Sequence, residues 1–257
     1  MSVTGRSALV VGISLLASAC GKKGPLIYPD MLSPAAPSAV TARQSGAVVR
    51  LQFGVPEKNR TGQSISGLAG VKINRRAAES GQQTSCRSCM TDYLLFKTLY
   101  LDHLPINTQR FGSTLIVLDG DVAAGNSYSY TIIPFTADGV DGAVARTADV
   151  RVTAPLPPPG LQIESLPTEI KLKISAEPLL TGRSIGYNLY RSPTGSTVRP
   201  YQPLNREPLT TNEFVDVTIE RGVKYRYSVR ALIMLPTGDV VESADSNEVQ
   251  GELANDE

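Results

Sequence analysis

The chain has 257 residues, 41% of them hydrophobic, and 25 Lys and Arg against 24 Asp and Glu give a formal net charge of +1. This balance leaves no basic surplus for binding nucleic acid and no acidic surplus for a cationic partner. With 22 Gly, 18 Pro and no Trp, the composition favours many short elements joined by turns.

The first 19 residues predict a cleavable signal peptide. Arg6 supplies a positive charge near the start, and residues 8–16 form an apolar core that is too short to span a bilayer. Small residues at 17–19 suit a signal peptidase, and Cys20 follows at once. The stretch Leu15–Cys20 resembles the bacterial lipobox. This resemblance implies that the chain is cut before Cys20, which is then lipidated with acyl chains such as palmitate and holds the protein to a membrane.

The residue after the cysteine is Gly21 rather than Asp. By the sorting rule of enteric bacteria, this resemblance implies localisation to the outer membrane of a Gram-negative cell.

Residues 20–36 are expected to be a Pro-rich tether. Between Gly21 and Pro37 the chain has four prolines and two glycines, so we expect an extended, partly polyproline spacer. The ten residues from Cys20 to Pro29 resemble the Cys-Gly-x-Lys-Gly-Pro-Leu-x-x-Pro signature of small Gram-negative outer-membrane lipoproteins. One of these associates with the lipopolysaccharide translocon. A plain spacer is the favoured interpretation of this segment, and attachment to an outer-membrane complex is the alternative.

Two segments of the chain repeat a pattern of short strands separated by turns. Apolar and polar residues alternate with a period of two, which is typical of strands with one buried face. In residues 37–153 the expected strands are 48–53, 71–75, 94–100, 113–118, 126–135 and 148–152. In residues 161–252 they are 170–174, 187–191, 214–217, 222–231 and one near 246–249. A Pro-rich linker at 154–160 separates the segments, and residues 253–257 form a tail. The spacing predicts an antiparallel sandwich in each segment.

Each segment also looks like a fibronectin type III domain. The first carries Leu51-x-Phe53-x-x-Pro56 and Gly125-x-x-Tyr128-x-Tyr130, and the second carries Gly222-x-x-Tyr225-x-Tyr227-x-Val229-x-Ala231 and Asn247-Glu248-Val249. The resemblance implies an all-β chain of two tandem antiparallel β-sandwiches, fibronectin type III or immunoglobulin-like, after the signal peptide and the tether. It also implies that Tyr128 and Tyr225 have the structural role of tyrosine corners, in which the hydroxyl bonds nearby backbone.

Cys86 and Cys89 form the main chemical motif of the sequence. A disulfide formed in an oxidising periplasm is the favoured interpretation. A redox-active pair is an alternative, but its flanks here form a polar loop rather than the start of a helix. A metal site or free thiols are the other alternative, and a structural zinc would need two more ligands. Met90 stands where a covalent haem site needs His, which excludes that site.

The remaining candidates for chemistry have simpler interpretations. His103 is expected to be a surface or edge-strand residue rather than a general base, because no nucleophile motif accompanies it. Asp119-Gly120-Asp121 and the segment Asp138–Gly142 lack the spacing of a calcium loop and are expected to be turns. We therefore expect no catalytic residue, no metal site and no cofactor.

Taken together, the sequence favours a non-enzymatic lipoprotein whose two sandwiches face the periplasm or the cell exterior. Its expected work is protein interaction or scaffolding in the cell envelope, with an envelope protein as its partner. Residues 77–112, in the middle of the first segment, are the region where a partner is expected. The alternatives are a glycan- or peptidoglycan-binding module and an accessory factor of an outer-membrane assembly complex. Nucleic acid is not expected as a partner.

Overall fold

The computed structural model of the chain describes residues 28–65, 67–78 and 92–255. Cys20, Cys86 and Cys89 lie outside these residues. The chain divides into two units, residues 1–32 and 33–257. The described part of the first unit forms a short 3-10 helix, η1 (Pro29–Leu32), where the sequence predicts an extended spacer. Within the described ranges, none of the helical segments has the length and apolar character needed to span a membrane.

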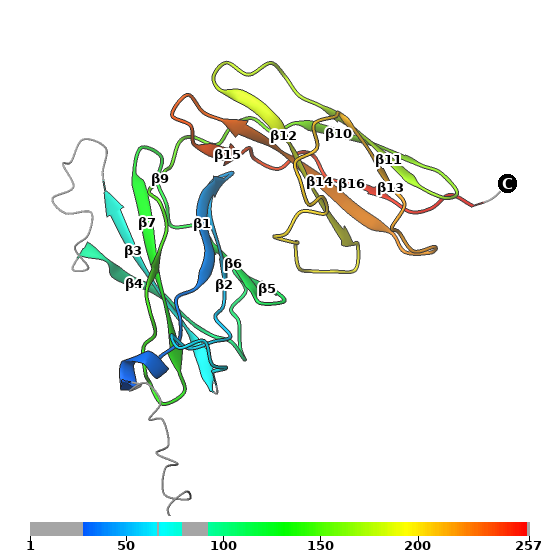
Figure 1. Cartoon of the computed structure of the whole chain (residues 1–257). Coiled ribbons are helices and arrows are strands. Elements are labelled where there is room, and N and C mark those ends of the chain that lie inside the picture. The colour runs from blue at the N-terminus through cyan, green and yellow to red at the C-terminus, as the bar shows by residue number, and fades with distance from the viewer. Residues whose placement is uncertain (1–27, 66, 79–91, 256–257) are drawn as a thin grey trace, which may run out of the picture. The chain divides into compact units, whose positions relative to one another are not determined.

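The second unit begins with a sandwich of two antiparallel sheets (Figure 1). Its first sheet contains β1 (Ser38–Ser45), β2 (Val48–Gly54), β6 (Thr114–Asp119) and β5 (Thr108–Phe111), in that order. Its second sheet contains β4 (Leu94–Tyr100), β3 (Leu68–Ala78) and β7 (Ser127–Thr136), and both β8 (Ala145–Arg146) and β9 (Val150–Arg151) pair with β7. Alternate residues of β2, namely Val49, Leu51 and Phe53, are fully buried between the sheets. The period of two in the sequence thus becomes the inner face of the strand.

A second sandwich follows in the same unit. One sheet contains β10 (Gly160–Ser165), β11 (Ile170–Ser175) and β13 (Glu213–Asp216). The facing strands are β12 (Arg183–Pro193) and β14 (Tyr225–Met234), and both β15 (Val240–Glu242) and β16 (Val249–Gly251) pair with β14. Ile170, Leu172, Leu189, Tyr227 and Val229 fill the core. The distribution of strands between sheets is that of the fibronectin type III sandwich in both copies, which confirms the predicted all-β class and the two tandem antiparallel sandwiches.

The two sandwiches share a sheet. Ser45 of β1 pairs in parallel with Glu242 of β15, so a continuous sheet has the order β12-β14-β15-β1-β2-β6-β5. The glycine after β1, Gly46, turns the chain into β2 with a φ of 60°, and its N–H donates to the Glu242 carbonyl at 3.0 Å. The sequence analysis expects neither β1 nor β15, and therefore does not expect this connection.

Each sandwich contains the same buried cluster of an aspartate, a tyrosine and an arginine. Asp119 ends β6 with no exposed surface, and it accepts hydrogen bonds from Tyr130 at 2.8 Å and Arg75 at 3.0 Å. In the second sandwich the corresponding aspartate ends β13, and the donors are on β14 and β12. These residues are Asp216, Tyr227 and Arg191, with hydrogen bonds of 2.9 Å from the tyrosine and 2.8 Å from the arginine. The cluster ties three strands of each sandwich together at one end of its core.

The pKa of the Asp216 carboxyl predicts how the stability of the protein depends on this residue and on pH. Burial alone raises this pKa, but hydrogen bonds from Thr218, Arg191 and Tyr227 outweigh burial and lower it. A lowered folded-state pKa gives stability that is present above the unfolded pKa of about 4 and is lost as pH falls through the folded value. We expect Asp216→Asn to lower the free energy of unfolding by about 2 kcal/mol at pH 7, and the difference from wild type to shrink in acid. Urea unfolding at pH 7 and pH 3 measures both values.

The matched control is Glu213→Gln, which changes an exposed carboxylate on the same strand. It should leave the free energy of unfolding almost unchanged. An Asp216→Asn effect of equal size at both pH values would contradict the account of this cluster.

Candidate functional site

The two predicted corner tyrosines lie in the cores, with hydroxyls that reach the backbone. The Tyr128 hydroxyl accepts from the Ala123 N–H at 2.9 Å, and the Tyr225 hydroxyl accepts from the Glu220 N–H at 3.4 Å. Both donors lie five residues upstream of the tyrosine, and both rings are buried. These contacts have the geometry that defines a tyrosine corner, and they serve the fold rather than chemistry.

The other described residues considered for chemistry do not gather into a metal-binding arrangement. His103 is exposed in the turn after β4. The Asp121 N–H donates to the Asp119 carboxylate at 3.0 Å, but Asp119 is the last residue of β6 and belongs to the buried cluster rather than to the expected turn. Gly139 has a φ of 84° in the turn after β7. Within the described ranges, no group of three or more His, Cys, Asp or Glu side chains is placed to hold a metal ion.

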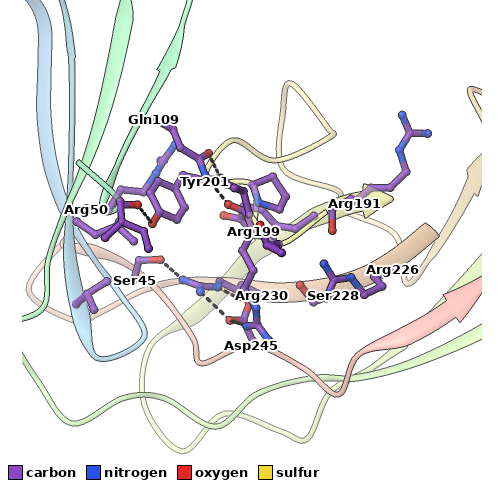
Figure 2. Close-up of a pocket in the computed structure, with 18 of the residues that line it drawn as sticks. Ser45, Arg50, Gln109, Arg191, Arg199, Tyr201, Arg226, Ser228, Arg230 and Asp245 are labelled. Atoms are coloured by element: carbon purple, nitrogen blue, oxygen red, sulfur yellow. Dashed lines mark hydrogen bonds and ion pairs between the residues drawn. The ribbon is translucent and has the colours of Figure 1, made fainter. Parts of the chain in front are cut away.

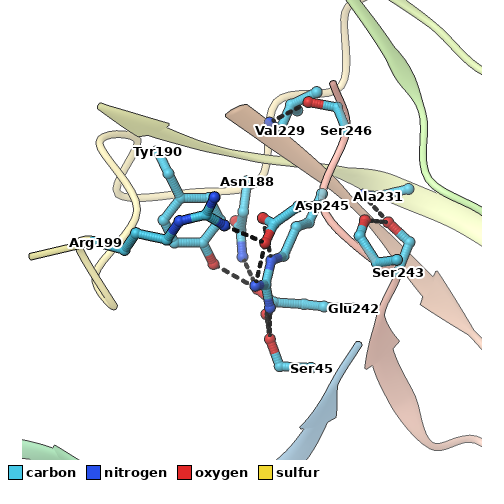
Figure 3. Close-up of polar contacts among 12 residues, drawn as sticks. Ser45, Asn188, Tyr190, Arg199, Val229, Ala231, Glu242, Ser243, Asp245 and Ser246 are labelled. Atoms are coloured by element: carbon cyan, nitrogen blue, oxygen red, sulfur yellow. Dashed lines mark hydrogen bonds and ion pairs between the residues drawn. The ribbon is translucent and has the colours of Figure 1, made fainter. Parts of the chain in front are cut away.

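The junction between the sandwiches contains a buried carboxylate that the sequence analysis does not single out. Glu242 ends β15 with 1% of its surface exposed. Its carboxylate accepts hydrogen bonds from the Ser45 hydroxyl, from the Asn188 amide and, at 3.0 Å, from the Tyr190 hydroxyl (Figure 3). The Arg230 guanidinium lies 3.8 Å away and also donates to Ser45. Ser45 belongs to the first sandwich, and Asn188, Tyr190 and Arg230 belong to the second, so the partners of one carboxylate come from both.

The surroundings of this carboxylate keep it ionised. Burial raises the pKa of Glu242, but hydrogen bonds from Ser45 and Asn188 and the charge of Arg230 outweigh burial and lower it. Burial likewise lowers the pKa of Arg230, whereas the two hydrogen bonds and the charge of Asp245 raise it overall. Asp245 binds the Arg230 guanidinium through both of its oxygens, at 2.7 and 2.8 Å. Two carboxylates and one arginine thus form a satisfied charge network in the junction.

A second set of contacts joins the sandwiches beside this network. The Gln109 side chain of β5 donates to the Arg199 carbonyl and accepts from the Tyr201 N–H at 2.8 Å. The Tyr201 hydroxyl donates to the Ile106 carbonyl at 3.3 Å. The loop after β12, at residues 199–201, therefore forms hydrogen bonds to the first sandwich through both its backbone and a side chain.

Between these two sets of contacts lies a cavity of about 620 Å³. Ser45, Arg50 and the loop at 104–106 line it from the first sandwich, and residues of β12, β14 and the 197–201 loop line it from the second (Figure 2). Its lining includes five arginines, Arg50, Arg191, Arg199, Arg226 and Arg230, against two acidic residues, Asp245 and Glu248. A concave surface with a few convergent cationic groups suits the binding of an anion. This cavity is the candidate functional site.

The sequence does not predict this site, because each of its residues fits a simple strand pattern within its own segment. Val240-Val241-Glu242 reads as a short apolar run with a surface glutamate. Arg50 reads as the polar position of an alternating strand, which is correct for the first sandwich by itself. The outer face of β2, which carries Arg50, is buried only because the second sandwich lies against it. The buried aspartate clusters, by contrast, could have been found from the sequence, because the aspartate precedes its tyrosine by 11 residues in both copies.

Comparisons with known proteins add little to this description. No protein-family model matches the chain, and no curated protein matches it. Among solved structures, the chain is similar to the crystal structure of the FN1–FN3 domains of chicken CNTN1, with 11% sequence identity and a TM-score of 0.31. The match covers 92% of this chain and 75% of that chain. The argument for a function therefore depends on the residues of this chain.

Removing the junction carboxylate should destabilise the protein strongly. Glu242→Ala leaves the donors of Ser45, Asn188 and Tyr190 without their acceptor and removes a nearby negative charge from Arg230. We expect a loss of about 3 kcal/mol in the free energy of unfolding at pH 7, measured by urea titration.

Glu220→Ala, at an exposed position of the second sandwich, is the matched control and should change the free energy of unfolding little. A Glu242→Ala variant as stable as wild type would show that the junction does not depend on this carboxylate.

Proposed function

We propose that this chain is a non-enzymatic lipoprotein of the Gram-negative cell envelope that binds an envelope protein and acts as a scaffold at the outer membrane. The lipobox-like segment that ends at Cys20 supports the membrane anchor. The fibronectin type III fold is compatible with interaction but does not establish it, because sandwich folds host many functions. The specific support comes from β4 of the first sandwich.

Strand β4 lies at the edge of its sheet and carries apolar side chains into solvent. The sheet order is β4-β3-β7-β8, so among the described strands β4 pairs with β3 alone (Figure 1). Leu94 is 74% exposed, Leu95 64% and Tyr100 54%. Natural edge strands are usually protected by charges or bulges, because an open apolar edge invites another strand to pair. Strand β4 has Lys97 and a bulge opposite Ile73 and Asn74, and it still leaves Leu94 and Leu95 exposed. This edge is the observation that carries the proposal.

The chemistry of such an edge favours an extended segment of a protein partner. The backbone groups of β4 would pair with the partner segment, while Leu94 and Leu95 would contact its apolar side chains. The strand also lies within residues 77–112, where the sequence analysis expects a partner.

The two alternatives have less support. A glycan-binding module needs a platform of exposed rings. Among the described rings of the first sandwich, Tyr100 and Phe111 are exposed, but Tyr100 lies on β4 and Phe111 on β5, which belong to different sheets. A role in an outer-membrane assembly complex depends on the signature between Cys20 and Pro29, nearly all of which lies outside the described residues.

Site-specific photo-crosslinking of the lipidated chain in a Gram-negative host tests the proposal. A photoreactive side chain replaces Leu95, and the same group at Leu180, whose side chain is fully exposed in the second sandwich, is the control. We expect a discrete adduct with an envelope protein from position 95 and none from position 180. Adding Leu94→Lys should reduce the adduct at least tenfold, since a charge on the apolar edge costs more than about 1.4 kcal/mol of binding.

A Cys20→Ala arm tests the anchor separately. Without lipid, the chain should leave the outer-membrane fraction and the adduct should decline. Equal adducts from positions 95 and 180, or an adduct unaffected by Leu94→Lys, would contradict the interaction surface. Retention of Cys20→Ala in the outer membrane would contradict the anchor.

A further inference from the structure

Three side-chain atoms in the described part of the chain are buried without a hydrogen-bond partner. They are Nε of Arg50, Oγ1 of Thr108 and Nε of Arg226. All three residues line the cavity between the sandwiches. Folded proteins leave few buried polar groups unpaired, and an exception points to a bound ion, water or ligand. The exceptions here are concentrated at one place.

Of these three residues, Arg50 gives the strongest indication of a bound ligand. Only 4% of its surface is exposed, and among the described residues no hydrogen bond or ion pair involves its guanidinium. It lies on the face of β2 opposite the core residues Val49 and Leu51, and it pairs with Leu118, which also lines the cavity. Burial, followed by the charge of Arg43, lowers its pKa. A buried and unpaired guanidinium is costly unless an anion reaches it.

The other arginines of the cavity differ in how their charges are balanced. Arg191 is 2.8 Å from Asp216, Arg230 is 2.7 Å from Asp245, and Arg199 is 3.5 Å from Asp245. Arg226 donates only to the carbonyl of Ser196, which does not neutralise its charge. Arg50 and Arg226 are therefore the two arginines of the lining without a carboxylate within ion-pair distance, among the residues the structure describes.

These two guanidinium groups lie on the same face of the shared sheet. Arg226 pairs with Ser192 and Ser228 pairs with Tyr190, so both pairs project from the face of β12 and β14 opposite the second core. Figure 2 shows Arg50 and Ser45 at one side of the cavity and Arg226 and Ser228 at the other. Thr108 is weaker evidence for a ligand in the cavity. It pairs with Val117, which faces the first core, so the Thr108 side chain is on the core side of the sheet.

Apart from the charged residues and Gln109, the lining is apolar or hydroxylated. Leu104, Pro105, Ile106, Val198, Pro200 and the ring of Tyr201 contribute to it. Such a wall favours a ligand that carries an apolar or ring-shaped part beside its charge.

We propose that this cavity binds an oxyanion, the phosphate or carboxylate group of a small molecule, through the guanidinium of Arg50, with Arg226 as a second cationic contact. A guanidinium presents a planar fork of donors that matches both groups. The site is separate from the β4 edge, so it goes beyond the proposed function and does not depend on it.

Thermal unfolding of the full chain tests the site. The probes are inorganic phosphate, glucose 6-phosphate and citrate, each compared with chloride at equal ionic strength. We expect at least one of the three to raise the unfolding temperature of the wild type, because a ligand that binds only the folded state stabilises it. Arg50→Met should abolish this rise and should unfold at a higher temperature than wild type in chloride, since it removes an unpaired buried charge.

Isothermal titration with the most effective probe gives the second readout. Arg50→Lys, which keeps the charge but loses the fork, and Arg226→Gln should each weaken binding at least tenfold. Arg151→Gln, at an exposed arginine of β9, should bind like wild type. Phosphate-selective, sugar-phosphate-selective or citrate-selective binding identifies which source of the oxyanion the cavity prefers.

Three results would overturn the proposal. The first is no response of the wild type to any probe up to about 10 mM, tenfold above a weak dissociation constant of about 1 mM. The second is an equal response in the wild type and Arg50→Met. The third is a lower unfolding temperature of Arg50→Met in chloride together with unchanged binding by Arg50→Lys, which would make Arg50 a structural residue.

Discussion

The buried carboxylate of Glu242 is the interaction on which the arrangement of the second unit depends. A carboxylate with 1% exposure is stable only if donors surround it. Two of its donors, on Asn188 and Tyr190, belong to the second sandwich together with the cation of Arg230, and the third donor, Ser45, belongs to the first. The complete set therefore exists only when β15 lies beside β1. The parallel pairing of these two strands supplies backbone hydrogen bonds at the same point, so charge and backbone are satisfied together.

This junction also explains the position of the cavity. The shared sheet brings the outer face of β2 toward the outer face of β12 and β14, and that approach buries Arg50 without giving it a partner. An arginine at this position is unremarkable in an isolated sandwich, where it is solvated. Joining the sandwiches converts it into a desolvated cation that faces a space of about 620 Å³. The exposed edge at β4 is on the other sheet of the first sandwich, so the proposed interaction and the proposed ligand would use different sheets.

Much of the architecture could be predicted from the sequence, because it depends on local alternation. Strand β2 and strand β7 were expected within a few residues of their observed bounds, since their buried faces repeat every second residue. Strand β1 was missed because its sequence, SAVTARQS, is mostly polar, and its pairing is supplied by neighbours. The candidate site could not be predicted in the same way. Ser45 and Glu242 are 197 residues apart, and neither shows in its own segment that it will be buried.

The central claim is that the two sandwiches form one cooperative body through the Glu242 junction. Differential scanning calorimetry of the whole chain tests it most directly. The account predicts a single unfolding transition whose calorimetric enthalpy equals its van't Hoff enthalpy. Two separable transitions, each with the enthalpy of one sandwich, would contradict it and would make the junction a contact between independent domains.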